Sequence, residues 1–238
     1  MNQSLSKAKK FVLDLIFPIY CLNCGQEGAY LCQICQSSLI LVPPTCFVCK
    51  KLSFPDRENG KNTCLNCQKN TKISFFASPL NYGDPKIRDL IHDLKYKRIK
   101  SIGNFLGDIL ADSLVKQKII FPENIVVIPI PLHKKRERER GFNQSQIIGQ
   151  VLSDRFALNL ETKILFKQKE TKPQMELTAE ERKNNLKAAF LVKNKEKIQG
   201  FPILLVDDVK TTGSTLEEAA QVLRQSGIKK VWAVTVAH

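Results

Sequence analysis

The sequence predicts an α/β fold, with a parallel sheet covered by helices on both faces, preceded by a small cysteine-rich module. Residues 201–206 form a short apolar run that ends in two adjacent carboxylates, a small polar loop and a helical pattern. Two more apolar runs, 125–128 and 231–237, are long enough for buried strands. All eight cysteines precede residue 68. We therefore expect two domains, residues 1–70 and 71–238.

Residues 1–20 are expected to form a short amphipathic helix that packs on the cysteine-rich module. The apolar stretch that ends at Tyr20 is interrupted by Asp14 and Pro18 and lacks a small-residue cleavage site, so we do not interpret it as a signal peptide. No apolar run approaches the length of a membrane span. We expect a cytoplasmic protein in a reducing compartment.

The cysteines occur as four Cys-x-x-Cys pairs, which predict structural zinc. Thiolates at positions i and i+3 share one tight turn, and two such turns complete a tetrahedral four-sulfur site with no open position. We expect two Zn²⁺ ions bound sequentially, the alternatives being a cross-brace of the first and third pairs or a redox dithiol. The ligands would be Cys21, Cys24, Cys32, Cys35, Cys46, Cys49, Cys64 and Cys67.

Beyond the cysteines, residues 68–80 join the module to the larger domain. A turn at residues 82–85 precedes apolar residues at helical spacing in 87–94 and again in 102–109. The basic segment 95–100 between them could contact a nucleic-acid backbone or a substrate phosphate, but we favour a solvated helix end. His92 and His238 have no evident partner and are expected to be incidental.

The most basic segment, residues 133–141, follows the strand at 125–128 and is interpreted as a loop. A cationic loop between a strand and a helix is well placed to neutralise a pyrophosphate, or it could bind single-stranded nucleic acid. A solvated charged helix is the less favoured alternative. The candidate pyrophosphate residues are Pro131, Leu132, His133, Lys134 and Arg136.

The polar segment 167–185 is a candidate lid, and the capping box from Thr178 to Glu181 should start another helix. The last helix, which includes Leu216, should end at Gly227, before the strand at 231–237.

The loop after residue 208 has the chemistry of a phosphate site. Amides of residues 211–215 lie at a predicted helix start, where unpaired N–H groups attract anions, and Gly213 lets the backbone close around one. Asp207 and Asp208 would repel a phosphate, so they should face sugar hydroxyls or Mg²⁺. The loop thus predicts a ribose 5-phosphate ligand. The phosphate-binding candidates are Val209, Lys210, Thr211, Thr212, Gly213, Ser214 and Thr215.

This segment closely resembles the PRPP-binding signature of type I phosphoribosyltransferases. A Walker B strand is the rival interpretation, but the chain has no G-x-x-x-x-G-K-[ST] loop. The whole chain resembles the ComF family, in which a double zinc ribbon precedes a phosphoribosyltransferase-like domain. The resemblance rests on Cys21-x-x-Cys24, Tyr82, Leu90-Ile91-x-x-Leu94-Lys95-Tyr96, Pro129-x-Pro131-Leu132-His133, Arg138-Glu139-Arg140-Gly141-Phe142-Asn143-Gln144, Thr171-x-Pro173-Gln174, Arg182-x-x-Asn185 and the loop itself.

The resemblance implies a type I phosphoribosyltransferase fold, a Rossmann-like sheet with a small hood. It also implies binding of PRPP with Mg²⁺, with Asp207 and Asp208 on the ribose hydroxyls as the candidate catalytic pair. In function it implies natural competence: cytoplasmic handling of imported single-stranded DNA, beside a ComFA-type helicase. The resemblance does not imply an acceptor for the phosphoribosyl group.

Composition supports polyanionic partners, because Lys and Arg exceed Asp and Glu by a formal net charge of +14. Two hypotheses follow: a PRPP-binding phosphoribosyltransferase-like protein, or a non-catalytic single-stranded DNA-binding module whose phosphate pocket senses PRPP or a nucleotide. DNA binding should weaken steeply with salt, whereas PRPP binding should require Mg²⁺ and the two aspartates.

Overall fold

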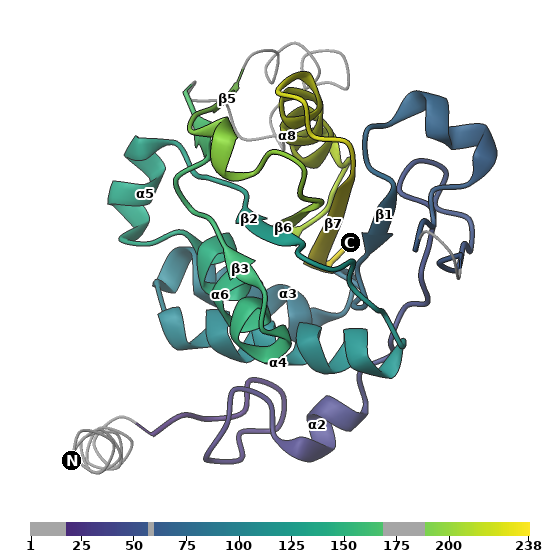
Figure 1. Ribbon diagram of the computed structural model, residues 1–238. Coiled ribbons are helices and arrows are strands. Elements are labelled where there is room, and N and C mark those ends of the chain that lie inside the picture. Colours follow the sequence, from purple (N-terminus) through teal and green to yellow (C-terminus); the bar gives the residue numbers. More distant parts are fainter. Residues whose placement is uncertain (1–17, 57–59, 169–188) are drawn as a thin grey trace.

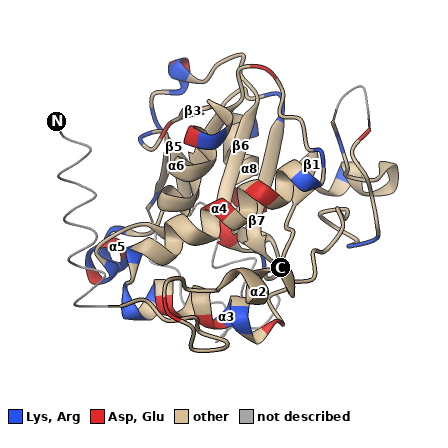
Figure 2. Cartoon of the chain, turned by 90° about the horizontal axis from the view of Figure 1, so that it is seen from below, with Lys and Arg blue, Asp and Glu red and all other residues tan. Residues whose placement is uncertain are grey.

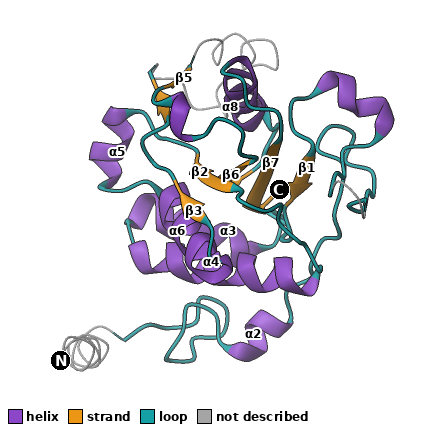
Figure 3. Cartoon of the chain, viewed as in Figure 1, coloured by secondary structure: helices purple, strands orange, loops and turns teal. Residues whose placement is uncertain are grey.

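The computed structural model describes residues 18–56, 60–168 and 189–238, and its centre is a five-stranded parallel sheet. Figure 1 shows the strands in the order β1-β7-β6-β2-β3. Helices cover both faces, which confirms the predicted fold class (Figure 3). The strands are β1 (Phe75–Ala77), β2 (Val126–Pro129), β3 (Asn159–Leu160), β6 (Ile203–Val209) and β7 (Val231–Ala237).

One face of the sheet packs on α3 (Pro85–His92), α4 (Lys100–Lys116) and α6 (Gln144–Phe156). Alternate residues of the strands, such as Leu204 and Val206, point to this side, as the two-residue period of a strand requires. The helices α4 and α6 lie close together because α4 carries glycine at the contact. A Cβ at Gly107 would lie 2.8 Å from the Cβ of Val151.

The other face packs on α8 (Ser214–Gln225) and on a small antiparallel sheet of β4 (Leu165–Lys167) and β5 (Phe190–Val192). Ile203 and Leu205, which alternate with the residues named above, are buried here. The cysteine-rich segment also reaches this face. Phe47 packs edge-on against Phe76 of β1, with ring centroids 5.3 Å apart.

The cysteine-rich segment contains two short helices, α2 (Gln33–Ser37) and η1 (Leu65–Asn70). Cys32 and Cys35 belong to the hydrophobic cluster of α3 and α4, so this segment packs directly on the larger domain. A boundary at residue 70 stays a prediction. The expected helix at residues 1–20 falls almost entirely outside the described residues, as do most of the candidate lid and the helix expected at its capping box.

The prediction of a loop at residues 133–141 is wrong for most of this segment, because Lys134–Arg140 form the helix α5, which Figure 2 labels. The His133 side chain caps its first turn by accepting a hydrogen bond from the Lys135 amide, and Gly141 ends it with φ of 80°. None of the residues of α5 is buried, so the segment is a solvated charged helix, the alternative that the sequence analysis favoured less. Within the ranges described, no helix combines the length and hydrophobicity needed to cross a membrane.

Candidate functional site

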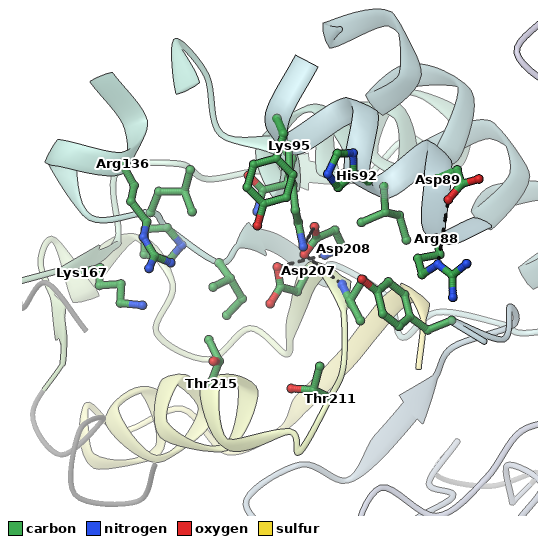
Figure 4. A pocket seen from close by; sticks show the side chains of 18 residues that line it. Arg88, Asp89, His92, Lys95, Arg136, Lys167, Asp207, Asp208, Thr211 and Thr215 are labelled. Atoms are coloured by element: carbon green, nitrogen blue, oxygen red, sulfur yellow. Dashed lines mark hydrogen bonds and ion pairs between the residues drawn. The ribbon is translucent and has the colours of Figure 1, made fainter. Parts of the chain in front are cut away.

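A cavity of about 520 Å³ opens where β2 and β6 end, the edge at which α/β sheets bind ligands. Figure 4 shows β6 and the first turn of α8 on one side and α3 with the following helical turn on the other. The lining residues are Tyr82, Arg88, Asp89, Ile91, His92, Lys95, Tyr96, Ile130, Pro131, Leu132, Arg136, Gln144, Lys167, Asp207, Asp208, Val209, Thr211 and Thr215.

The predicted pair of carboxylates lies in this cavity, on the last residues of β6 rather than beyond the strand. The carboxylate Oδ1 of Asp207 accepts hydrogen bonds from Ser145 Oγ at 2.8 Å and from the Asp208 amide at 2.9 Å. Asp208 Oδ1 accepts from the Val209 amide at 2.9 Å. Its Oδ2 lies 2.5 Å from the ammonium of Lys95, whose side chain reaches down from the opposite wall (Figure 4).

The electrostatics of the pair favour a cationic ligand. Burial, together with the negative charge of Asp208, raises the pKa of Asp207 to about 7, although the Ser145 hydrogen bond and Lys95 act in the opposite direction. Burial lowers the pKa of Lys95, but the charge and hydrogen bond of Asp208, together with the charge of Asp207, outweigh it, so the net shift is upward. One lysine therefore does not fully compensate the buried Asp208 carboxylate and the partly buried Asp207 carboxylate, and an additional positive charge would stabilise their ionised forms.

Lys95 was predicted to lie on a solvated helix end, and this is wrong. It belongs to a π-helical turn, η2 (Asp93–Lys97), that continues α3. A π-helical turn holds an extra residue, so side chains after it are rotated relative to the α-helical pattern, and such turns are frequent at functional sites. The family motif includes Lys95, and the less favoured alternative gave segment 95–100 a contact with a substrate phosphate, but neither predicted the ion pair with Asp208.

The polar loop joins β6 to α8 as predicted, and Gly213 caps the helix with φ of 83°. Thr212 Oγ1 and Ser214 Oγ are hydrogen-bonded to each other at 2.7 Å. Of the seven phosphate-binding candidates, Val209, Thr211 and Thr215 line the cavity, whereas Lys210, Thr212, Gly213 and Ser214 are not among its lining residues.

The Lys210 side chain points away from the cavity toward the cysteine-rich segment. Its ammonium lies 4.8 Å from the ring centroid of Phe47 and 5.1 Å from that of Phe76. Burial and, to a smaller extent, the positive charge of Lys50 lower the pKa of Lys210 to about 8, although Cys46 acts in the opposite direction. The Lys210 side chain therefore packs behind the loop and does not line the cavity, and its role as a phosphate ligand stays a prediction.

The pyrophosphate candidates divide in the same way. Pro131, Leu132 and Arg136 line the cavity, but His133 caps α5 and Lys134 is exposed outside the lining. Sequence reasoning missed Lys167 of β4, which lies on the same side as Arg136 in Figure 4. Burial lowers the pKa of Lys167, and the positive charge of Arg136 adds to the effect. These two cations form a positive wall that would suit a polyphosphate.

The α3 side of the cavity was also missed. His92, expected to be incidental, lines the cavity and packs against Tyr96, with ring centroids 4.7 Å apart and the ring planes tilted by 36°. Arg88, Asp89 and Tyr82 complete this side.

The eight cysteines form two separate groups, Cys21/Cys24/Cys32/Cys35 and Cys46/Cys49/Cys64/Cys67, in the predicted sequential order. Within each group the sulfur atoms lie within 4.8 Å of one another. The Cys24–Cys32 and Cys49–Cys64 sulfur pairs are 3.6 and 3.8 Å apart, close to the separation of about 3.8 Å that a tetrahedron with metal–sulfur bonds of about 2.3 Å requires. Both groups therefore fit structural zinc.

Comparison with known proteins agrees with this geometry. Residues 143–238 match the model of the phosphoribosyl transferase domain. Competence protein ComFC of Bacillus subtilis is 34% identical over 232 residues, 89% of this chain and 91% of the relative. Competence protein F of Haemophilus influenzae is 30% identical, with coverage of 93% and 86%. DNA utilization protein YhgH of Escherichia coli K12 is 31% identical, with coverage of 86% and 96%.

The parallel sheet and the loop that joins β6 to α8 define the chain as one with a phosphoribosyltransferase domain. Two four-cysteine groups precede that domain, and the matches to the relatives, which cover 89% and 93% of this chain, extend into both parts. The chain belongs to the ComFC-like family.

Proposed function

We propose that the protein binds PRPP together with Mg²⁺ in the cavity at the end of β6, as a phosphoribosyltransferase-like protein of natural competence. The observation that carries the proposal is the juxtaposition of paired carboxylates with a polar loop at a helix start and a positive wall at the other end. These features match a ribose, its 5′-phosphate and a pyrophosphate, in that order.

The residues would divide the ligand between them. Asp207 and Asp208 would accept hydrogen bonds from the ribose hydroxyls, and Thr211 and Thr215 would lie on the 5′-phosphate with the amides of the α8 start. Arg136 and Lys167 would face the pyrophosphate. Mg²⁺ fits the carboxylate oxygens and would supply the positive charge that the raised pKa of Asp207 indicates is lacking.

If the protein is catalytic, the bond from C1 of the ribose to pyrophosphate would break and an acceptor would form a new bond at C1. The positive wall would stabilise the negative charge on the leaving pyrophosphate. The two aspartates would stabilise the positive charge that develops on the ribose. The acceptor would enter from the side of α3, where His92 and Tyr96 line the cavity.

The competence role draws on the relatives. Two are named competence proteins and one a DNA utilization protein, and the basic composition of this chain suits a single-stranded DNA partner. We place the protein on the cytoplasmic side of DNA uptake, with a ComFA-type helicase as a candidate partner.

Thermal unfolding with and without PRPP–Mg²⁺ tests the pocket. A ligand at about 100 times its Kd adds roughly 2.7 kcal/mol, which for a chain of this size raises Tm by roughly 5–10 °C. The shift should vanish in Asp207→Ala/Asp208→Ala and should require Mg²⁺. The conservative Asp207→Asn variant guards against misfolding of the double variant. An equal shift in wild type and both variants, or no shift in any, would contradict the proposal.

A further inference from the structure

A second, strongly basic groove lies at the opposite ends of the strands, where they begin. It has a volume of about 260 Å³ and runs past the residues that precede β1 and β7. Its described lining contains five cationic side chains and no carboxylate: Lys61, Lys72, Arg224, Lys229 and Lys230. Among the described residues, two carboxylates interact with this lining: Glu217, which accepts hydrogen bonds from Thr71 and the Lys72 amide, and Asp56, whose charge acts on Lys230. The cations outnumber them, so the groove attracts anions.

An aromatic cavity of about 550 Å³ adjoins this groove, and Lys230 lines both. The partly exposed Phe121 and the buried Trp232, whose side chain is 1% exposed, border the cavity, and its charged lining residues are Lys118, Lys230 and Asp56. The Trp232 ring stacks on Phe75, with centroids 4.2 Å apart. Its indole N–H is buried and has no acceptor among the described residues, although a buried Trp N–H normally has one. A ligand that enters this cavity with a carbonyl or ring-nitrogen acceptor could supply it.

Both features are well separated from the candidate PRPP pocket. Val231 pairs with Ile203 at the start of β6, five residues before Asp208. At about 3.3 Å per residue this places the two sites roughly 17 Å apart along the strand. A ligand could therefore occupy the basic groove while PRPP occupies the pocket.

We propose that the groove of Lys61, Lys72, Arg224, Lys229 and Lys230, with the adjoining cavity of Phe121 and Trp232, is the binding surface for single-stranded DNA. The cations would follow the phosphate backbone, and one unpaired base would enter the aromatic cavity. Base–aromatic contacts and a basic groove are the two components of single-strand binding. A duplex keeps its bases stacked and paired, so it could use the groove but not the cavity. This inference rests on the proposed function for its choice of DNA as the polyanion.

Trp232 is the single tryptophan of the chain, so its fluorescence reports on this cavity directly. A thymidine oligonucleotide of about 12 nucleotides should quench the emission, and a duplex of the same length should quench it less. Because the candidate PRPP pocket lies at the carboxyl ends of the strands, far from Trp232, PRPP–Mg²⁺ should leave the Trp232 emission nearly unchanged. Absence of quenching by the single strand would overturn the proposal.

Charge neutralisation locates the backbone contacts. Lys72→Gln/Lys229→Gln removes two exposed cations of the groove and should weaken oligonucleotide binding about tenfold near physiological salt. The slope of log K against log salt should become shallower by about 1.4, since each lost contact with a single strand contributes about 0.7. The matched variant is Lys134→Gln/Arg138→Gln, which removes the same charge from α5, the most basic segment and the rival DNA surface. A larger loss in the α5 variant, or equal losses in both, would refute the assignment.

The PRPP thermal shift separates this inference from the proposed function. The Lys72→Gln/Lys229→Gln variant should keep the full shift, which also shows that it folds. Oligonucleotide binding with no PRPP shift would contradict the pocket and leave the DNA surface standing. If PRPP raises Tm but the Lys72→Gln/Lys229→Gln variant binds the oligonucleotide as tightly as wild type, the DNA surface would be contradicted and the PRPP pocket would stand.

Discussion

Replacing Asp207 by asparagine should stabilise the ligand-free protein at high pH while it removes PRPP binding. Asparagine keeps an oxygen for the hydrogen bonds from Ser145 and the Asp208 amide but carries no charge. In the wild type, burial and Asp208 raise the pKa of Asp207 to about 7 from its ordinary value of 3.8. The folded state therefore binds a proton that the unfolded state has already lost, and its stability falls as the pH rises between these values.

The size of the effect follows from the same two values. Complete ionisation would cost the folded state at most about 4 kcal/mol. Between pH 6 and pH 8.5 the carboxyl passes from about nine-tenths protonated to almost fully ionised, which lowers stability by about 1.4 kcal/mol. Lys210 acts in the opposite direction, because its pKa is lowered to about 8 and stability from this residue rises with pH. This contribution is common to wild type and variant, so it cancels in their difference.

Urea unfolding without Mg²⁺ at pH 6 and pH 8.5 measures the difference in stability between wild type and Asp207→Asn. Zinc stays bound to the thiolates over this pH range. Asp207→Asn should gain about 1.4 kcal/mol relative to wild type as the pH is raised. Glu139→Gln, which neutralises an exposed carboxylate on α5, controls for overall charge. A difference between Asp207→Asn and wild type that stays constant, or that shrinks at pH 8.5, would refute the electrostatic argument.

Two other substitutions test neighbouring parts of the site. Lys95→Met leaves the buried Asp208 carboxylate without its partner and should lower the free energy of unfolding, measured in urea, by about 3 kcal/mol. The control Lys97→Met breaks a more exposed ion pair on the same turn and should cost less than about 1 kcal/mol. Equal costs would argue against a buried ion pair. Cys49→Ser should lower the zinc content from two ions per chain to one and weaken PRPP binding. The matched variant is Cys24→Ser, in the other cysteine group. A zinc content that stays at two ions per chain in both variants would contradict the four-sulfur sites.

The sequence predicted the central strands well because they are continuous apolar runs. The three runs at 125–128, 201–206 and 231–237 correspond to β2, β6 and β7. Strand β1 and the pair β4–β5 have three residues each, too few to display a period, and they exist because the sheet and α8 provide partners. Helix α5 was missed because its charged residues show no apolar face, although His133 and Gly141 are adequate caps.

The candidate site was predictable only where its residues are contiguous. Asp207, Asp208, Thr211 and Thr215 occur in one motif, and all four line the cavity. Lys95 precedes them by more than a hundred residues, and its direction depends on a π-helical turn that propensities do not encode. Lys210 shows the converse: it lies within the motif, but the aromatic rings behind the loop hold its ammonium away from the cavity.

Those rings link the second cysteine group to the phosphate loop. A Cβ at Gly213 would lie 2.8 Å from Cζ of Phe47, so the ring and the loop are in close contact, and Phe47 is adjacent to the candidate metal ligand Cys46. One turn further along α8, Glu217 accepts hydrogen bonds from Thr71 and the Lys72 amide, just beyond Cys67. The segment around the second four-sulfur site thus contacts the loop on one side and the first turns of α8 on the other. Because such small modules fold only with their metal, zinc at this site should fix the loop that faces the phosphate, although no cysteine lines the pocket.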